Sequence, residues 1–88
     1  NPFNPNTQIE FDINPPTKSS GLENATLDIF NILGQRVKTL LNRPLSPGHY
    51  SVSWDATDQN GHKVSTGIYF YRLEVGDRNQ TKKMMLLK

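Results

Sequence analysis

Apolar and polar residues alternate along several stretches of this chain, which is the pattern of β-strands that bury one face. In residues 7–13, the side chains of Ile9, Phe11 and Ile13 share one face and polar side chains share the other. The same alternation predicts strands over residues 25–30, 50–54 and 68–75. A last strand is predicted over residues 78–87, directly after the turn residues Gly76 and Asp77.

Residues 36–41 alternate less regularly and have two interpretations. The apolar residues of this region also fit the 3.6-residue period of a helix: Leu33, Val37, Leu40 and Leu41. A strand is favoured, because Gly34 and Asn42 leave too little room for a stable helix. Gly34 is expected to supply a positive φ at the bend before this strand.

Turn signals separate the predicted strands. They are Asn14-Pro15-Pro16, the turn-rich connection over residues 43–48, and Asp58-Gln59-Asn60-Gly61, whose Asn-Gly pair is a strong hairpin signal. Residues 14–24 form a long polar loop between the first two strands. Six to seven short strands and no clear helix predict an all-β fold, an immunoglobulin-like antiparallel β-sandwich of about seven strands.

The chain has 88 residues, which fits a single domain. Residues 1–6 are interpreted as the end of a linker and residues 7–88 as the sandwich, so the chain is expected to be a piece of a larger protein. The formal charge of +2 is too small to indicate a nucleic-acid partner. No stretch approaches the roughly 20 apolar residues of a membrane-spanning helix, so membrane insertion is not expected.

The sequence offers little to catalysis. It has no cysteine, and its two histidines, His49 and His62, lie at a strand edge and in a turn, without metal-ligand spacing. Asp12 and Asp28 are candidates for paired carboxylates, but both fall on the polar side of alternating strands, where a solvated face is the better interpretation. We therefore expect no enzyme activity and no cofactor.

The loop around Asp58 carries a weak candidate for a calcium site. Asp55, Asp58 and Asn60, followed by Gly61, superficially resemble an oxygen-rich calcium loop. The closing Glu of an EF-hand is missing, because position 66 is Thr. An Asx-type turn, in which a short polar side chain bonds to its own backbone, is the favoured interpretation.

Four aromatic residues are open to two interpretations. Strand periodicity places Tyr50 with Trp54 and Tyr69 with Tyr71. Such stripes more often form the core of a sandwich, which commonly contains one buried Trp. The alternative is a carbohydrate-binding platform, in which case the chain is a binding or spacer module appended to a secreted hydrolase.

The last predicted strand also has two interpretations. Residues 82–88, with the sequence KKMMLLK, are basic, then apolar, then basic. Met84 and Leu86 fall on one face of a strand, and Met85 and Leu87 fall on the other. A strand that is apolar on both faces suits either a buried position or an edge that awaits a partner.

Four segments taken together resemble a known family. They are NPFNPNTQIEF at 1–11, LDIFNILGQRVKTL at 27–40, GHYSVSWDATDQNGHKVSTGIYFYRL at 48–73, and KKMMLLK at 82–88. Their order and spacing resemble the C-terminal sorting domain of the type IX secretion system, found on surface and secreted proteins of Bacteroidetes. They are also similar to the Ig-like domain of the flagellar hook-capping protein, although the terminal lysine motif argues against that role.

The resemblance implies a non-catalytic sorting signal that directs an N-terminal cargo domain across the outer membrane. The implied partners are the type IX outer-membrane translocon and a surface sortase that removes the domain. The implied location is the periplasm in transit and then the cell surface or the medium. The resemblance assigns recognition to Gly67, Tyr69, Lys82, Lys83, Met84, Met85, Leu86, Leu87 and Lys88.

Overall fold

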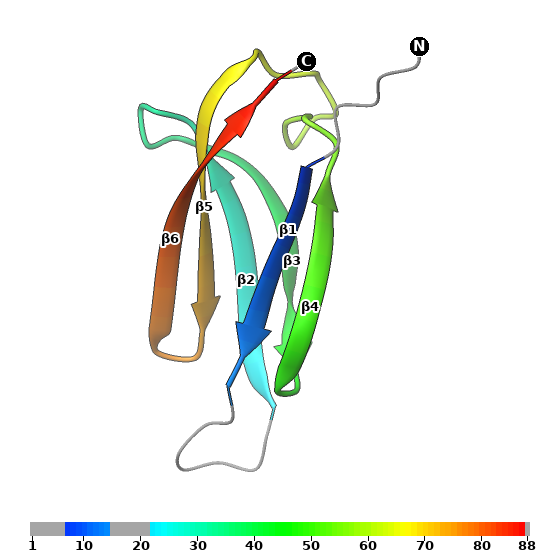
Figure 1. Ribbon diagram of the computed structural model, residues 1–88, viewed down its shortest axis with the longest axis vertical. Coiled ribbons are helices and arrows are strands. Elements are labelled where there is room, and N and C mark those ends of the chain that lie inside the picture. The colour runs from blue at the N-terminus through cyan, green and yellow to red at the C-terminus, as the bar shows by residue number, and fades with distance from the viewer. Residues whose placement is uncertain (1–6, 15–21, 88) are drawn as a thin grey trace.

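A computed structural model of the chain describes residues 7–14 and 22–87, and shows an all-β sandwich (Figure 1). The two sheets are antiparallel, and the smaller one pairs β1 with β4. The larger sheet has the strand order β3-β2-β5-β6. The strands are β1 (Thr7–Ile13), β2 (Glu23–Phe30), β3 (Arg36–Leu45), β4 (Gly48–Trp54), β5 (Gly67–Val75) and β6 (Arg78–Leu86).

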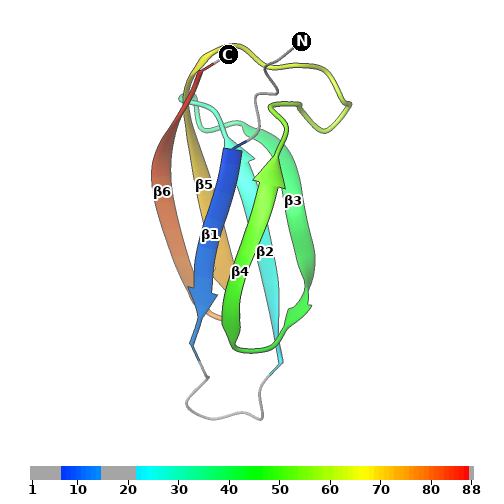
Figure 2. The ribbon, with the colours of Figure 1, turned by 45° about the vertical axis from the view of Figure 1, so that its right-hand side comes forward.

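The two sheets stack face to face, with β1 and β4 in front of the larger sheet in Figure 2. The predicted alternation is confirmed, because the apolar face of each strand points into the space between the sheets. The core consists of Ile9, Phe11, Ile13, Ala25, Leu27, Ile29, Leu45, Trp54, Ala56, Tyr69, Leu73, Val75 and Leu86. The described part of the chain contains no helix, and therefore none long and apolar enough to cross a membrane.

Residues 36–41 are a strand, as predicted, and this strand is longer than expected. It continues through Pro44 to Leu45, because Arg43 and Leu45 pair with residues of β2. The turn-rich connection predicted over residues 43–48 is thus reduced to Ser46 and Pro47. The described residues form six strands, slightly fewer than the seven expected. The predicted linker over residues 1–6 and most of the predicted loop over 14–24 lie outside the described residues.

Trp54 occupies the centre of the core, as the favoured interpretation predicted. Trp54 is 0% exposed, and its indole N–H donates to the Thr57 carbonyl at 2.9 Å. Its ring packs edge-on against the Tyr69 ring, with the ring centroids 5.2 Å apart. The Tyr69 hydroxyl donates to the Ser65 carbonyl at 2.7 Å. A tyrosine bonded to backbone a few residues upstream is a hallmark of immunoglobulin-like sandwiches.

The hairpin between β5 and β6 has a turn that only glycine fits well. Val75 pairs with Arg78, so Gly76 and Asp77 are the two turn residues. Gly76 has a φ of +60°, which is the first position of a type II′ turn. A Cβ added there would also lie 2.5 Å from the Glu23 carboxylate. This turn sets the register of β6.

Asp28 is an exception to the predicted solvated face. It is 5% exposed, and the Thr39 hydroxyl donates to its carboxylate at 2.6 Å. Its neighbours Thr39 on β3 and Arg72 on β5 enclose it in the middle of the larger sheet. Asp12 is exposed on the smaller sheet, so the two carboxylates do not form a pair.

Candidate functional site

The larger sheet has two edges, and the one at β3 is partly covered. The Gln59 backbone N–H donates to the Val37 carbonyl at 2.9 Å, and the Gln59 side-chain oxygen accepts the Thr39 N–H at 3.0 Å. Gln59 thereby occupies hydrogen-bonding groups that a new strand would need. Further along β3, Pro44 has no N–H to offer. Strand addition at β3 is therefore blocked in two places.

The other edge of the larger sheet, at β6, is open. Within the described residues β6 pairs with β5 and with no further strand (Figure 1). In a two-residue hairpin the residues that close the turn, here Val75 and Arg78, exchange backbone hydrogen bonds. Along an antiparallel ladder such hydrogen-bonded pairs alternate with pairs that are not hydrogen-bonded to each other. The residues whose N–H and C=O groups point away from β5 are therefore Asn79, Thr81, Lys83 and Met85.

The register also divides the predicted recognition residues of β6 between the two faces of the sheet. Leu86 is buried in the core and Met84 packs against it, so their side chains serve the fold. Lys83 is exposed, and Met85 on the outer face is 56% exposed. Lys82 and Leu87 are exposed as well, and Lys88 lies outside the described residues. The candidate site is therefore the outward backbone of β6 together with its exposed basic and apolar side chains.

Gly67 and Tyr69 take structural positions at the start of β5. Gly67 pairs with Leu86 and Tyr69 pairs with Met84, so both lie opposite the end of β6. The Tyr69 ring is buried against Trp54, and its hydroxyl is used by Ser65. Because Tyr69 is 6% exposed, its side chain offers little surface to a receptor, and the recognition role implied by the resemblance stays a prediction. Tyr69 anchors the strand that holds β6.

The charge of β6 is positive. Arg78 forms an ion pair with Glu23 at 2.5 Å. Neither Lys82 nor Lys83 forms an ion pair with any described residue. Lysine on an edge strand opposes pairing with another copy of the same basic strand. The same charges attract an acidic partner.

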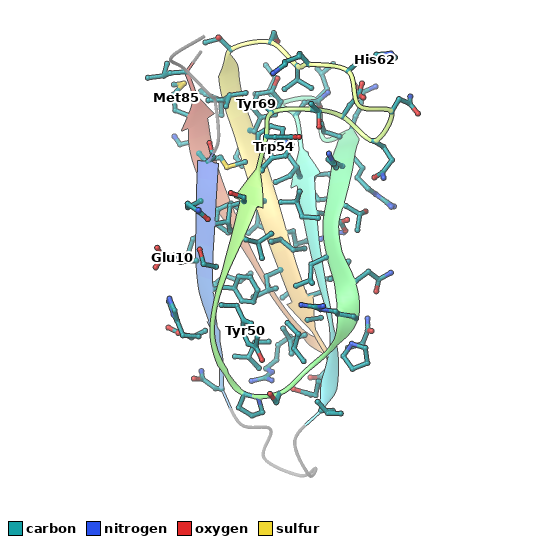
Figure 3. The ribbon with its side chains drawn as sticks, turned by 90° about the vertical axis from the view of Figure 1, so that its right-hand side faces the viewer. Glu10, Tyr50, Trp54, His62, Tyr69 and Met85 are labelled. Carbon is teal, nitrogen blue, oxygen red and sulfur yellow. The ribbon has the colours of Figure 1, made fainter. Side chains whose placement is uncertain are left out.

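The four aromatic residues do not form the surface platform that carbohydrate binding would need. Trp54 and Tyr69 lie together inside the sandwich, whereas Tyr50 lies at the opposite end (Figure 3). Tyr50 stacks on Phe11 with ring centroids 5.6 Å apart, and its hydroxyl donates to the Ser46 carbonyl. Tyr71 packs against the core. The core interpretation is confirmed for Trp54, and the platform interpretation is corrected.

The favoured Asx-type turn is confirmed at Asp58. Its side-chain oxygen accepts the backbone N–H groups of Asn60 at 2.9 Å and His62 at 3.0 Å, and these bonds lower the pKa of Asp58. The Asp55 carboxylate accepts the Thr57 hydroxyl and lies 3.6 Å from the Lys38 ammonium, and both lower its pKa. Protein donors thus engage one oxygen of each carboxylate. In the part of the chain that the structure describes, no group of three His, Cys, Asp or Glu side chains is placed to hold a metal ion.

The outer face of the smaller sheet carries a histidine between two carboxylates. The His49 ring lies 2.7 Å from the Asp12 carboxylate and 3.3 Å from that of Glu10. Asp12 is the cross-strand partner of His49, and the hydrogen bond to it is the main reason that the pKa of His49 is raised. All three side chains are exposed. The cluster links β1 to β4 most strongly when the imidazole is protonated.

Comparison with known proteins gives one family. The model of the FlgD Ig-like domain matches residues 3–79, which is most of the chain. This chain belongs to the FlgD Ig-like domain family. No curated protein and no solved structure matches it. The family match ends at Asn79, the second residue of β6, so most of the open edge of this FlgD Ig-like domain lies beyond the matched region.

Sequence reasoning missed Asn79, Thr81 and Gln59. The signal for the first two is the Gly76-Asp77 turn, because a two-residue turn fixes which β6 positions face outward. Gln59 carries no such signal, since its role depends on where the loop after β4 meets β3.

Proposed function

We propose that this FlgD Ig-like domain is a non-catalytic C-terminal sorting domain that directs a larger cargo protein through the type IX secretion system. The receptor in this proposal adds a strand to the open edge of β6. The partners are the outer-membrane translocon and a surface sortase that then removes the domain. The cargo passes through the periplasm and ends at the cell surface or in the medium.

The observation that carries this proposal is the difference between the two edges of the larger sheet. Gln59 and Pro44 block the β3 edge, whereas β6 presents outward backbone groups over Asn79 to Met85 that pair with no described strand. An exposed edge is a hazard for aggregation unless it is protected or used. An extended partner segment that adds a strand gains affinity from main-chain hydrogen bonds and specificity from alternate side chains.

Sequence and structure support the same segment for this role. Residues 82–86 of the KKMMLLK segment, which resembles the sorting motif, form the end of β6, beyond the part that the family model matches. Its inward residue Leu86 fixes the strand to the core, while Lys83 and Met85 remain exposed for a partner. Lys83 then steers an acidic partner and Met85 supplies apolar contact.

The test is an export assay in a host with a type IX system. Residues 1–88 are fused behind a signal peptide and a reporter. Thr81→Pro removes an outward N–H that a receptor strand would use and leaves the β5–β6 bonds intact, and Thr81→Ala is the matched control. We expect the parent and Thr81→Ala fusions outside the cell and the Thr81→Pro fusion in the periplasm. Normal export of a folded Thr81→Pro fusion would refute recognition through this edge.

The family match also supports a second candidate function, that of an Ig-like module in a flagellar hook cap. That role requires the domain to assemble with other copies. Light scattering of the purified chain over a range of concentrations separates the two: concentration-dependent assembly favours the hook cap, and a monomer favours sorting.

A further inference from the structure

The outer face of the larger sheet, which points away from β1 and β4, carries an apolar hollow at one end. The hollow has a volume of about 290 Å³. Its floor comes from β2 and β5, and one wall comes from the turn that links β2 to β3. It is lined by Phe30, Asn31, Ile32, Gly34, Phe70, Arg72 and Thr81. Phe30 on β2 and Phe70 on β5 are cross-strand partners on the face of the sheet that points away from the core. Strand alternation places polar residues on that face, so these two rings form an apolar surface outside the core.

The wall of the hollow is a rigid turn built around Asn31. The Asn31 side-chain oxygen accepts the backbone N–H groups of Leu33 at 2.9 Å and Gln35 at 3.0 Å. The Asn31 side-chain amide donates to the Gln35 side chain at 2.9 Å. This turn holds Ile32 and Leu33 at 69% and 78% exposure. Because the turn is already ordered, covering these side chains costs little backbone entropy.

The floor of the hollow contains an arginine without a charged partner. The Arg72 guanidinium lies 4.9 Å from the centroid of the Phe30 ring. Its Nε atom is buried and has no hydrogen-bond partner, and no ion pair to a described residue forms. The cross-strand neighbour Asp28 is bonded to Thr39 instead. Arg72 therefore retains guanidinium donors that suit an external carboxylate.

The charge around the hollow is positive. Lys83 is the cross-strand partner of Phe70, so it flanks the aromatic floor. With Arg72 it places two cations beside the floor, and the buried Asp28 is the acid in the adjacent row. Two copies of this face would repel one another, whereas an acidic segment would be attracted.

We propose that this hollow docks an acidic segment of a partner protein. A large apolar side chain of that segment fills the space between Phe70 and the turn at Ile32, and a neighbouring carboxylate bonds Arg72. The inference stands on residues other than the β6 backbone, so it does not depend on the sorting proposal.

The probe is a blocked pentapeptide, acetyl-Gly-Glu-Phe-Asp-Gly-amide, titrated into the full chain to about 5 mM and followed by amide-detected NMR. We expect saturable shifts confined to residues 30–35 and 70–72. The matched peptide with Gln and Asn in place of the acids should bind about tenfold more weakly. Arg72→Gln should weaken binding by a similar factor. Ile32→Ser, on a lining side chain that is 69% exposed, should weaken it without endangering the fold. Arg43→Gln, on β3 at the other end of the sheet, should leave binding unchanged.

Three results would overturn the proposal. The first is the absence of saturable shifts in these residues. The second is equal binding of the acidic and neutral peptides. The third is a response of the same residues to dilution of the chain or to vesicles of phosphatidylglycerol, with none to the peptide, because the occupant would then be a second copy or a lipid surface.

Discussion

Proline should destabilise the domain strongly at one position of β6 and only slightly at the neighbouring position. Lys82 pairs with Tyr71 and Thr81 pairs with Arg72 in the ladder between β5 and β6. Counting from the type II′ turn, the Lys82 N–H donates to the Tyr71 carbonyl, whereas the Thr81 N–H points to the open edge. Lys82→Pro therefore removes a ladder hydrogen bond, and Thr81→Pro removes none.

The expected magnitudes follow from these bonds. Lys82→Pro loses one hydrogen bond, with a net value of about 0.5–1.5 kcal/mol, and leaves the half-buried Tyr71 carbonyl unpaired at a cost of about 1–3 kcal/mol. The total of about 1.5–4.5 kcal/mol is large for a domain of this size, whose stability is expected to be about 4–13 kcal/mol. The Thr81 side chain is exposed, so Thr81→Pro should cost less than about 1 kcal/mol.

Urea unfolding followed by Trp54 fluorescence measures both variants, because Trp54 is the chain's single tryptophan and lies in the core. With a slope of about 2 kcal/mol per molar urea, the middle of the usual range, Lys82→Pro should lower the midpoint by about 1–2 M. Thr81→Pro should stay close to the parent. If Thr81→Pro loses as much stability as Lys82→Pro, the assignment of inward and outward positions on β6 is refuted, and with it the proposed recognition edge.

Three further predictions concern the rest of the sandwich. Trp54→Ala should cost about 3–5 kcal/mol, measured by urea unfolding followed by circular dichroism, and a cost below about 1 kcal/mol would contradict its place in the core. The hydrogen bond to Asp12 raises the pKa of His49 in the folded chain. The pairing therefore stabilises the fold at pH values below the ordinary histidine pKa. This contribution is lost as the pH rises through the raised pKa. The melting temperature should therefore fall between pH values of about 5.5 and 8 more steeply for the parent than for His49→Gln, and parallel curves would contradict the linkage. Gln59→Ala should free the Thr39 N–H on the β3 edge and increase concentration-dependent association, measured by light scattering, while Asn60→Ala serves as the control in the same turn.

Much of the fold is readable from local sequence signals. Alternation of residues such as Ile9 and Phe11 identifies strands because the side chains of a strand point to opposite faces, and the identity of the buried face follows. Gly76 predicts the last hairpin because few residues adopt its positive φ. The continuation of β3 through Pro44 was not readable, since proline signals a turn except where a strand forms the edge of a sheet.

Local sequence patterns thus predict the all-β class and the approximate positions of the strands, and they favour a core place for Trp54 and an Asx-type turn at Asp58. Each depends on short-range periodicity or on a side chain bonding nearby backbone. The features on which the proposed function rests depend instead on contacts between distant parts of the chain. Which strands become neighbours decides three of these features. They are the burial of Asp28, the hydrogen bonds from Gln59 to β3, and the position of β6 at the edge of the described sheet. Strand order is set by contacts between residues far apart in the chain, and a local pattern does not encode it.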